Sequence, residues 1–96
     1  MESPVISNDV LARYAGDAAL EAPGVSGLTR DAAEVVEGDT TVDVDVHVEL
    51  AWGAGAESVA SDVQLRVTDY LERMANVRVG SVDVVVERVG APPAKR

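Results

Sequence analysis

The sequence predicts an α+β domain, a two-layer sandwich in which two helices pack on one face of a three- to four-stranded, mainly antiparallel sheet. Residues 40–50 alternate between polar and apolar side chains, which is typical of a strand that is covered on one face only. Residues 8–21 and 57–75 instead place their apolar residues at helical spacing. These two amphipathic helices can cover the valines of the strand, and the element order becomes (β)αββαβ.

The first helix is expected over residues 8–21, after a brief edge strand at residues 4–6. Ser7 is a suitable N-cap, because its side-chain oxygen can accept a hydrogen bond from a free N–H group of the first turn. Pro23 pushes the preceding residue toward an extended conformation and so ends the helix. Gly16 costs up to about 1 kcal/mol relative to alanine inside a helix, which indicates a close approach of helix and sheet.

A β-hairpin is expected in the middle of the chain. Residues 25–30 are predicted to form a connector, with Leu28 beneath the edge of the sheet. A short strand over residues 33–37 and a tight turn at Gly38-Asp39 then lead into the alternating strand.

The second helix is expected over residues 57–75, and the last strand over residues 77–89. In that strand Val79 and Val82 lie at positions of opposite parity, so a regular strand would point them to opposite faces. A β-bulge at Gly80-Ser81 would bring both valines to the core, and glycine is a common residue at bulges.

The amino-acid composition and net charge of the chain exclude several classes of function. Its 96 residues include 17 acidic and 8 basic ones, and the net charge of −9 opposes binding to nucleic acid or to an anionic bilayer. Without cysteine there is no disulfide, thiolate metal site or cysteine nucleophile. The longest apolar run is too short to span a membrane. We expect one domain over residues 1–90 and a disordered, basic, proline-rich tail at 91–96.

Acidic residues and one histidine occupy the polar side of the alternating strand and the matching part of the last strand. They are Asp43, Asp45, His47, Glu49, Asp83 and Glu87. Carboxylates and imidazole are suitable ligands for a divalent cation, and the first four would be the candidates. Such neighbours are about 6.5 to 7 Å apart along a straight strand, which is too wide for one ion, so we expect no metal site. The remaining interpretations are a solvated face partly paired with arginines, and a docking face for a basic or self-complementary partner.

Trp52, beside a glycine-rich turn, is either a lid over the end of the core or an exposed anchor of an interface. We include it with the six charged residues as a candidate interaction site. The strands at residues 42–50 and 82–86 can leave an unpaired sheet edge, which would permit strand-to-strand self-association. No enzyme activity is expected. A single histidine without cysteine supplies no nucleophile-and-base arrangement, and residues 7–9 lack the glycine and arginine of an acylphosphatase-like phosphate loop.

Nearly the whole chain resembles the alkaline shock protein family, the envelope stress response proteins. The most specific stretch is A-L-E-x-P-G-V-x-G at residues 19–27. Further similar stretches are residues 6–10, the alternating strand, residues 59–64 and residues 79–86. The resemblance implies a non-enzymatic bacterial protein of the cytoplasm that associates with the cell envelope, self-associates and is often recruited by a membrane-anchored partner. It carries over no catalytic or ligand residues.

We therefore expect a protein of cell-envelope stress response or homeostasis that acts as an oligomerising scaffold at the cytoplasmic face of the membrane. Its partners would be further copies of itself and a membrane-anchored protein, with no cofactor, no nucleic acid and no direct membrane insertion. The alternative is a small cation- or ligand-binding regulatory module that uses the acidic sheet face.

Overall fold

The structure, a computed structural model, describes residues 7–91 without the side chains of residues 30–32. The expected edge strand at residues 4–6 and residues 92–96 of the expected tail lie outside the described residues. In chain order the elements are α1 (Asn8–Leu20), β1 (Val25–Glu37), β2 (Val42–Leu50), α2 (Ala56–Met74) and β3 (Val79–Val89).

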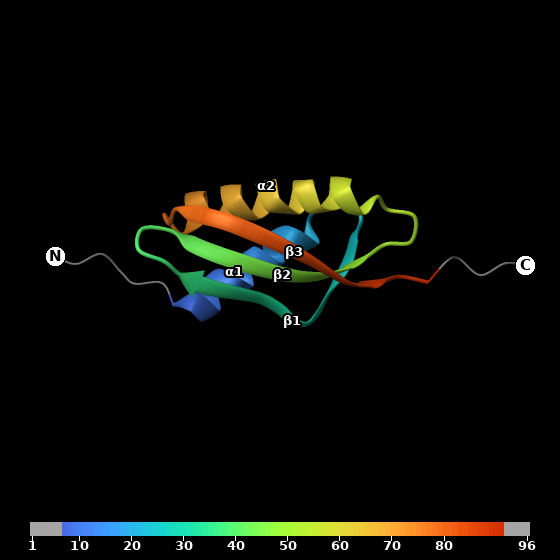
Figure 1. Ribbon diagram of the computed structural model, residues 1–96, viewed down its shortest axis with the longest axis horizontal. Coiled ribbons are helices and arrows are strands. Elements are labelled where there is room, and N and C mark those ends of the chain that lie inside the picture. The colour runs from blue at the N-terminus through green and yellow to red at the C-terminus, as the bar shows by residue number, and fades with distance from the viewer. Residues whose placement is uncertain (1–6, 92–96) are drawn as a thin grey trace, which may run out of the picture.

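The three strands form one sheet in the order β1-β2-β3, and both helices lie on the same side of it (Figure 1). The predicted α+β class with two helices on one face is confirmed. The sheet is mixed, however: β1 pairs with β2 in antiparallel fashion, and β3 pairs with β2 in parallel. Helix α2 carries the chain back from the end of β2 to its beginning, so β3 runs in the same direction as β2 and the sheet is less antiparallel than expected.

Strand β2 is at the centre of the sheet, and its alternation decides which face is buried. Its five apolar residues, Val42, Val44, Val46, Val48 and Leu50, are all buried, and the polar residues between them are not. Helix α2 packs against them with Val59, Val63, Val67 and Leu71. Helix α1 contributes Leu11 and the small residues Ala15, Ala18 and Ala19. The core is therefore built from aliphatic side chains between one sheet face and two helices.

Helix α1 begins at the predicted cap, where the Ser7 hydroxyl accepts a hydrogen bond from the N–H of Val10 at 3.3 Å. The predicted close approach at Gly16 is also found. A Cβ atom at this position would lie 3.1 Å from Cδ1 of Leu28, which belongs to β1. Glycine thus lets α1 approach β1 more closely than a larger residue would.

The connector expected at residues 25–30 is wrong, because these residues form the first part of β1. Leu28 pairs with Val48, and the next partners are Ala33 and Val46. The four residues at positions 29–32 thus face the single residue between those partners, and β1 changes direction sharply there (Figure 1). A bulge of this size interrupts the two-residue period, so the sequence pattern does not reveal one continuous strand.

The bulge predicted near the start of β3 is confirmed. Val79 pairs with Val42 and Ser81 with Asp43, which leaves Gly80 as the additional residue. A Cβ atom at Gly80 would lie 2.7 Å from Oδ1 of Asp43, so a side chain there requires a neighbour to move. With the bulge in place, Val82 turns toward the helices and is buried.

Candidate interaction surface

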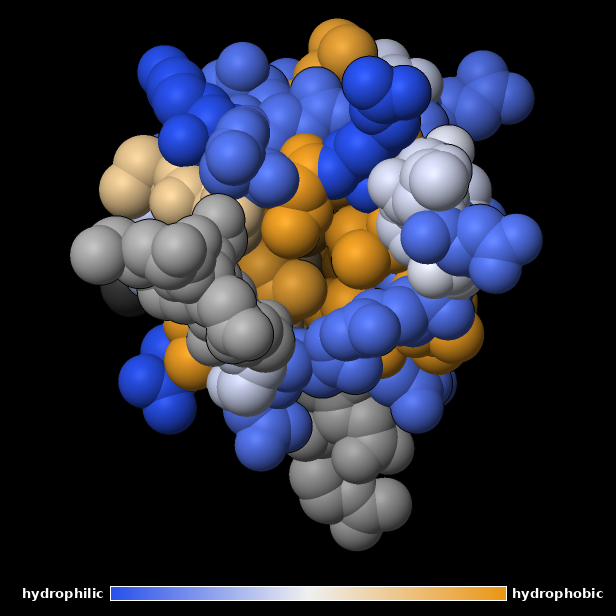
Figure 2. All heavy atoms as spheres, turned by 90° about the vertical axis from the view of Figure 1, so that its left-hand side faces the viewer, coloured by the Kyte–Doolittle hydropathy of each residue, from blue (hydrophilic) through white to orange (hydrophobic). Residues whose placement is uncertain are grey.

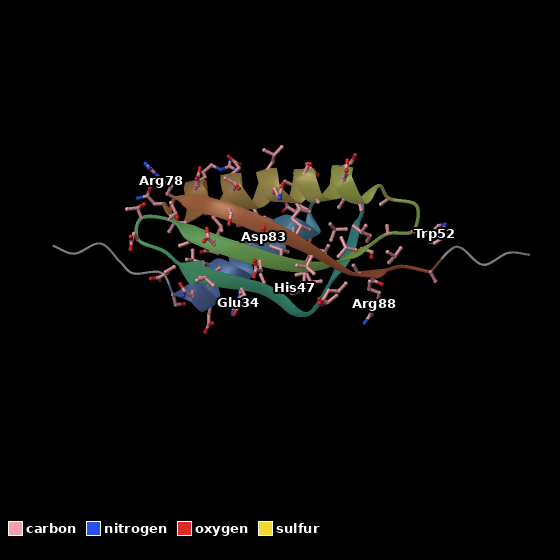
Figure 3. The ribbon with its side chains drawn as sticks, in the orientation of Figure 1. Glu34, His47, Trp52, Arg78, Asp83 and Arg88 are labelled. Atoms are coloured by element: carbon pink, nitrogen blue, oxygen red, sulfur yellow. The ribbon has the colours of Figure 1, made fainter. Side chains whose placement is uncertain are left out.

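The open face is the side of the sheet opposite the two helices, and it carries the candidate residues Asp43, Asp45, His47, Glu49, Asp83 and Glu87. Figure 3 shows Glu34, His47 and Asp83 distributed over this face. The strand register places Glu34 of β1 beside Asp45 of β2, and Asp45 beside Asp83 of β3. Adjacent strands are about 4.8 Å apart, so these three carboxylates form a line of like charge across the sheet. We call Glu34, Asp45 and Asp83 the acidic row.

Sequence reasoning missed Glu34, because its position opposite Asp45 depends on the register between β1 and β2. The signal that could have found it is the hairpin itself. Counting back from a loop at residues 38–41 brings Glu37 opposite Val42 and Glu34 opposite Asp45.

A second group on the open face joins all three strands. The Thr29 hydroxyl, in the bulge of β1, donates a hydrogen bond to Oε1 of Glu87 at 2.9 Å. The other carboxylate oxygen of Glu87, Oε2, lies 3.3 Å from Nδ1 of His47. That nitrogen is buried, and its contact lacks the geometry of a hydrogen bond. Glu87 therefore bridges β1 and β3 above His47, and one ring nitrogen of the histidine is inaccessible to a ligand.

The charges of the open face are not matched by arginines within the described side chains. The arginine ion pairs found in that part of the chain are Arg66 with Asp62 and Arg73 with Asp69, and both belong to α2. Asp43 accepts a hydrogen bond from the hydroxyl of Ser81 at 3.1 Å. Like charges opposite one another on a sheet are destabilising, so the acidic row is not explained by the stability of the fold.

The same arrangement does not form a metal centre. Among the side chains that the structure describes, no group of three or more histidine, cysteine, aspartate or glutamate residues is arranged to hold a metal ion. Asp43, Asp45, His47 and Glu49 follow one another along a single strand, where side chains of one face are too far apart to share an ion.

Trp52 lies in the turn between β2 and α2 and is 58% exposed. It therefore does not close the end of the core as a lid. Its exposure agrees with the other interpretation, an aromatic side chain available to an interface. Figure 3 shows Trp52 at one end of the molecule, away from Glu34 and Asp83 of the acidic row.

Of the two strands that could leave an unpaired sheet edge, β2 and β3, only β3 lies at an edge. Strand β2 is paired on both sides and has no free edge, whereas β3 is an edge strand. Two side chains of α2 bind backbone groups of β3: Nε2 of Gln64 donates to the carbonyl of Val82 at 2.9 Å, and Oε2 of Glu72 accepts from the N–H of Val79 at 3.1 Å. Beside these contacts α2 lines a shallow groove of about 540 Å³ that includes Leu65 and Thr68.

The end of the sandwich at the C-terminus of α2 has an apolar centre. Figure 2 looks onto this end and shows hydrophobic atoms surrounded by hydrophilic residues. Met74 is exposed here, close to the buried Leu71 and Ala75. Several of the other exposed large apolar residues belong to β3.

The model of the alkaline shock protein 23 family, described by a cell envelope-related function, matches residues 31–91. The match includes most of β1 and all of β2, α2 and β3, which is well over half of the chain. This chain belongs to the alkaline shock protein 23 family. The resemblance noted in the sequence is thus confirmed, and a cell envelope-related function is the established description of the family.

Solved structures of the MamM CTD are similar to this family member in fold. A zinc form of a MamM CTD variant has a TM-score of 0.65 and 19% identity, and the match covers 83% of this chain and 84% of that one. A copper form has a TM-score of 0.65 and 16% identity, with 92% and 91% covered. At these identities the likeness shows the fold alone. No curated protein sequence matches the chain. Within residues 7–91, neither helix has the length and apolar character needed to cross a membrane.

Proposed function

We propose that this alkaline shock protein family member is a non-enzymatic interaction domain that self-associates and serves as a scaffold for the cell envelope from the cytoplasmic side. The observation that carries the proposal is the edge strand β3. Val85, Val86 and Val89 are exposed along this strand, although an exposed apolar edge strand favours pairing with another chain. A protein that remained a monomer would gain nothing from such an edge.

The open face supports a second contact, with a different partner. The acidic row has the charge to bind a basic segment, and such a segment on a membrane-anchored protein would hold the scaffold at the membrane. Complementary charge raises association rates and selects partners more than it raises affinity. The family description and the resemblance favour an envelope partner over other basic proteins.

A non-enzymatic role is favoured by the burial of one ring nitrogen of His47, the single histidine of the chain. Its Nδ1 is buried against Glu87, so the imidazole cannot present both nitrogens to a substrate. General acid and base catalysis requires a side chain within hydrogen-bond reach of the reacting group. His47 is better explained as part of the contact that joins the three strands.

The alternative is a cation-binding regulatory module. It is favoured by the likeness in fold to zinc and copper forms of the MamM CTD. The acidic row would supply the carboxylates, but it would have to rearrange, since the described side chains form no ready ligand group.

Light scattering after size-exclusion chromatography tests the two functions, with a concentration series up to about 1 mM, where an association free energy of about −4 kcal/mol becomes visible. The scaffold should increase in mass with concentration, equally with EDTA and with added Zn²⁺. A strict monomer throughout would overturn self-association. A stability that rises by about 2.7 kcal/mol at a hundredfold excess of a cation over its dissociation constant would favour the alternative.

A further inference from the structure

The outer edge of β3 consists of two segments with different surroundings. We call residues 79–82 the capped segment, because the side chains of Glu72 and Gln64 bind its N–H at Val79 and its carbonyl at Val82. We call residues 84–89 the open segment. Figure 1 shows β3 beginning beside α2 and diverging from it toward the C-terminus, so α2 does not cover the open segment.

Burial along β3 follows the same division. On the side of the helices, Val82 is 6% exposed, Val86 37% and Val89 52%. On the open face, Val85 is 38% exposed. The open segment therefore presents valines on both faces of an edge strand. Proteins that avoid edge pairing often cover such an edge, as the side chains of α2 do at the capped segment, whereas the charges of the open segment are one acidic and one basic residue, Glu87 and Arg88.

Backbone N–H and C=O groups of the open segment are directed away from β2 in a regular pattern. The carbonyl of Val82 faces α2 and hence away from β2. From Val82 to Val86 the pairing with β2 is regular, so every second residue turns its N–H and C=O outward, and Val86 does so too. Beyond a register shift at Glu87, the N–H of Gly90 donates to the carbonyl of Leu50 at 2.7 Å. Gly90 therefore faces β2, and Val89 faces outward.

We propose that two copies of this chain pair through their open segments as antiparallel strands, about a twofold axis between Glu87 and Arg88. Val86 of each copy then lies opposite Val89 of the second copy, and Glu87 lies opposite Arg88 of the second copy. The inference rests on the proposed self-association and specifies its surface and register. Two sheets of three strands become one continuous sheet, with both pairs of helices on the same side at the join.

This register agrees with the faces on which the side chains lie. Directly opposed residues of an antiparallel pair share a face. Val86 and Val89 pair in β2 with the buried residues Val48 and Leu50, so both are on the helix side. Glu87 contacts His47 on the open face, and Arg88 is paired with Glu49 on that face.

The two neighbouring registers of the strand pair are unfavourable, which favours pairing of two copies in the proposed register. A shift by one residue in one direction centres the axis on Glu87 and places two glutamates opposite each other. A shift in the other direction centres it on Arg88 and opposes two arginines. Like charges directly opposite are destabilising, whereas the proposed register forms two opposite-charge pairs and two valine pairs. The segment is thus complementary to itself.

Cysteine crosslinking tests the register without interference, because the chain has no cysteine of its own. The hydrogen-bonded pair formed by residues 86 and 89 would have Cα atoms about 5.5 Å apart, within the range that a disulfide bridges. Residue 86 would be about 10 Å from residue 86 of the second copy, which a disulfide cannot bridge. An equal mixture of Val86→Cys and Val89→Cys proteins should therefore form a disulfide dimer on mild oxidation, and each variant alone should not.

The matched control is Val36→Cys, a valine of similar exposure on the other edge strand, β1. It should stay monomeric under the same mild oxidation as the mixture, as judged by non-reducing gel electrophoresis. Equal crosslinking of the single variants, or dimers of Val36→Cys only, would overturn the proposed register and surface.

A second pair of variants separates this surface from self-association in general. Val89→Lys places a charge opposite Val86 of the second copy and should raise the dimer dissociation constant about tenfold or more, whereas Val36→Lys should leave it unchanged. Light scattering measures both. If the unaltered chain assembles and Val89→Lys assembles equally well, this inference fails and the proposed function stands. If the unaltered chain never assembles, both fail.

Discussion

The two faces of β2 alternate residue by residue along the same strand but are used in opposite ways. On the helix side, Val44, Val46 and Val48 are fully buried and belong to one core cluster with residues of both helices and both neighbouring strands. On the open face, Asp43, Asp45 and Glu49 alternate with the buried residues of β2, and no arginine ion pair of the described side chains reaches them. The first face is explained by folding. The second is not needed for folding, which agrees with the proposed role of the open face in a contact outside the domain.

This contrast is what a two-layer sandwich makes possible. The sheet needs cover on one face only, so the other face is free to vary without loss of the core. Opposed carboxylates on that face cost about 0.2 to 1 kcal/mol per pair, which is small beside the free energy of the buried valines. The open face can therefore carry charge at a modest cost to stability.

The largest effect is expected from moving a charge to the buried face. Val46→Asp would bury a carboxylate that has no partner, and the effective penalty of several kcal/mol is comparable to the whole stability of a small domain. The cooperative thermal transition followed by circular dichroism should disappear. Asp45→Val, the adjacent change on the open face, should keep that transition. Retention of the original melting temperature by Val46→Asp would contradict the distinction between the faces.

A smaller loss is expected from Gly80→Ala, because the bulge at Gly80 aligns β3 with the buried face. The added Cβ would lie 2.7 Å from Oδ1 of Asp43 and 2.8 Å from Oγ1 of Thr41, so the strand or these side chains must move. We expect a loss of about 1 to 3 kcal/mol in the free energy of unfolding, measured by urea denaturation.

Gly55→Ala is the control for this change, since a Cβ at Gly55 meets nothing within 4 Å. Gly55 is the N-cap of α2, so the weaker N-capping of alanine opposes the stabilisation that comes from a stiffer unfolded chain, and the net change in the free energy of unfolding should stay below about 1 kcal/mol. Equal losses for the two variants would show that the space beside Asp43 is not what requires glycine in β3.

The smallest effect should come from the open face itself. Asp45→Asn removes the central charge of the acidic row and should raise the free energy of unfolding by a few tenths of a kcal/mol up to about 1 kcal/mol at low salt. The gain should shrink at about 1 M salt, where the Debye length is only about 3 Å. Asp69→Asn, which removes an ion pair with Arg73 on α2, should instead lower stability slightly. A loss of stability for Asp45→Asn would mean that the acidic row is neutralised within the fold.

Periodic patterns made much of the fold predictable from the sequence. The alternation in β2 and the apolar spacing in both helices were sufficient to predict a covered sheet, because burial imposes those periods directly. The bulge at Gly80 was predictable as well, since the valines change parity at a glycine. The first part of β1 was missed, because the four residues at positions 29–32 interrupt its period.

The interaction surface was predictable only in part. Residues of one strand share a face by simple alternation, so Asp43, Asp45 and His47 could be grouped; their role in an interaction stays a prediction. The pairing of Glu34 with Asp45 requires the strand register. The contacts of Gln64 and Glu72 with β3 require the position of α2 above the sheet edge, which no local pattern contains.

The parallel pairing of β3 has a consequence for how the chain folds. β1 and β2 are joined by a short loop at residues 38–41, whereas β3 reaches β2 only after the whole of α2. Local contacts form faster than contacts between distant parts of a chain, so the hairpin precedes the docking of β3. Until then one edge of the valine-rich β2 is unpaired. We expect the negative charges of Asp43 and Asp45 to oppose pairing of this edge with another unfinished chain, and so to reduce aggregation while the protein folds.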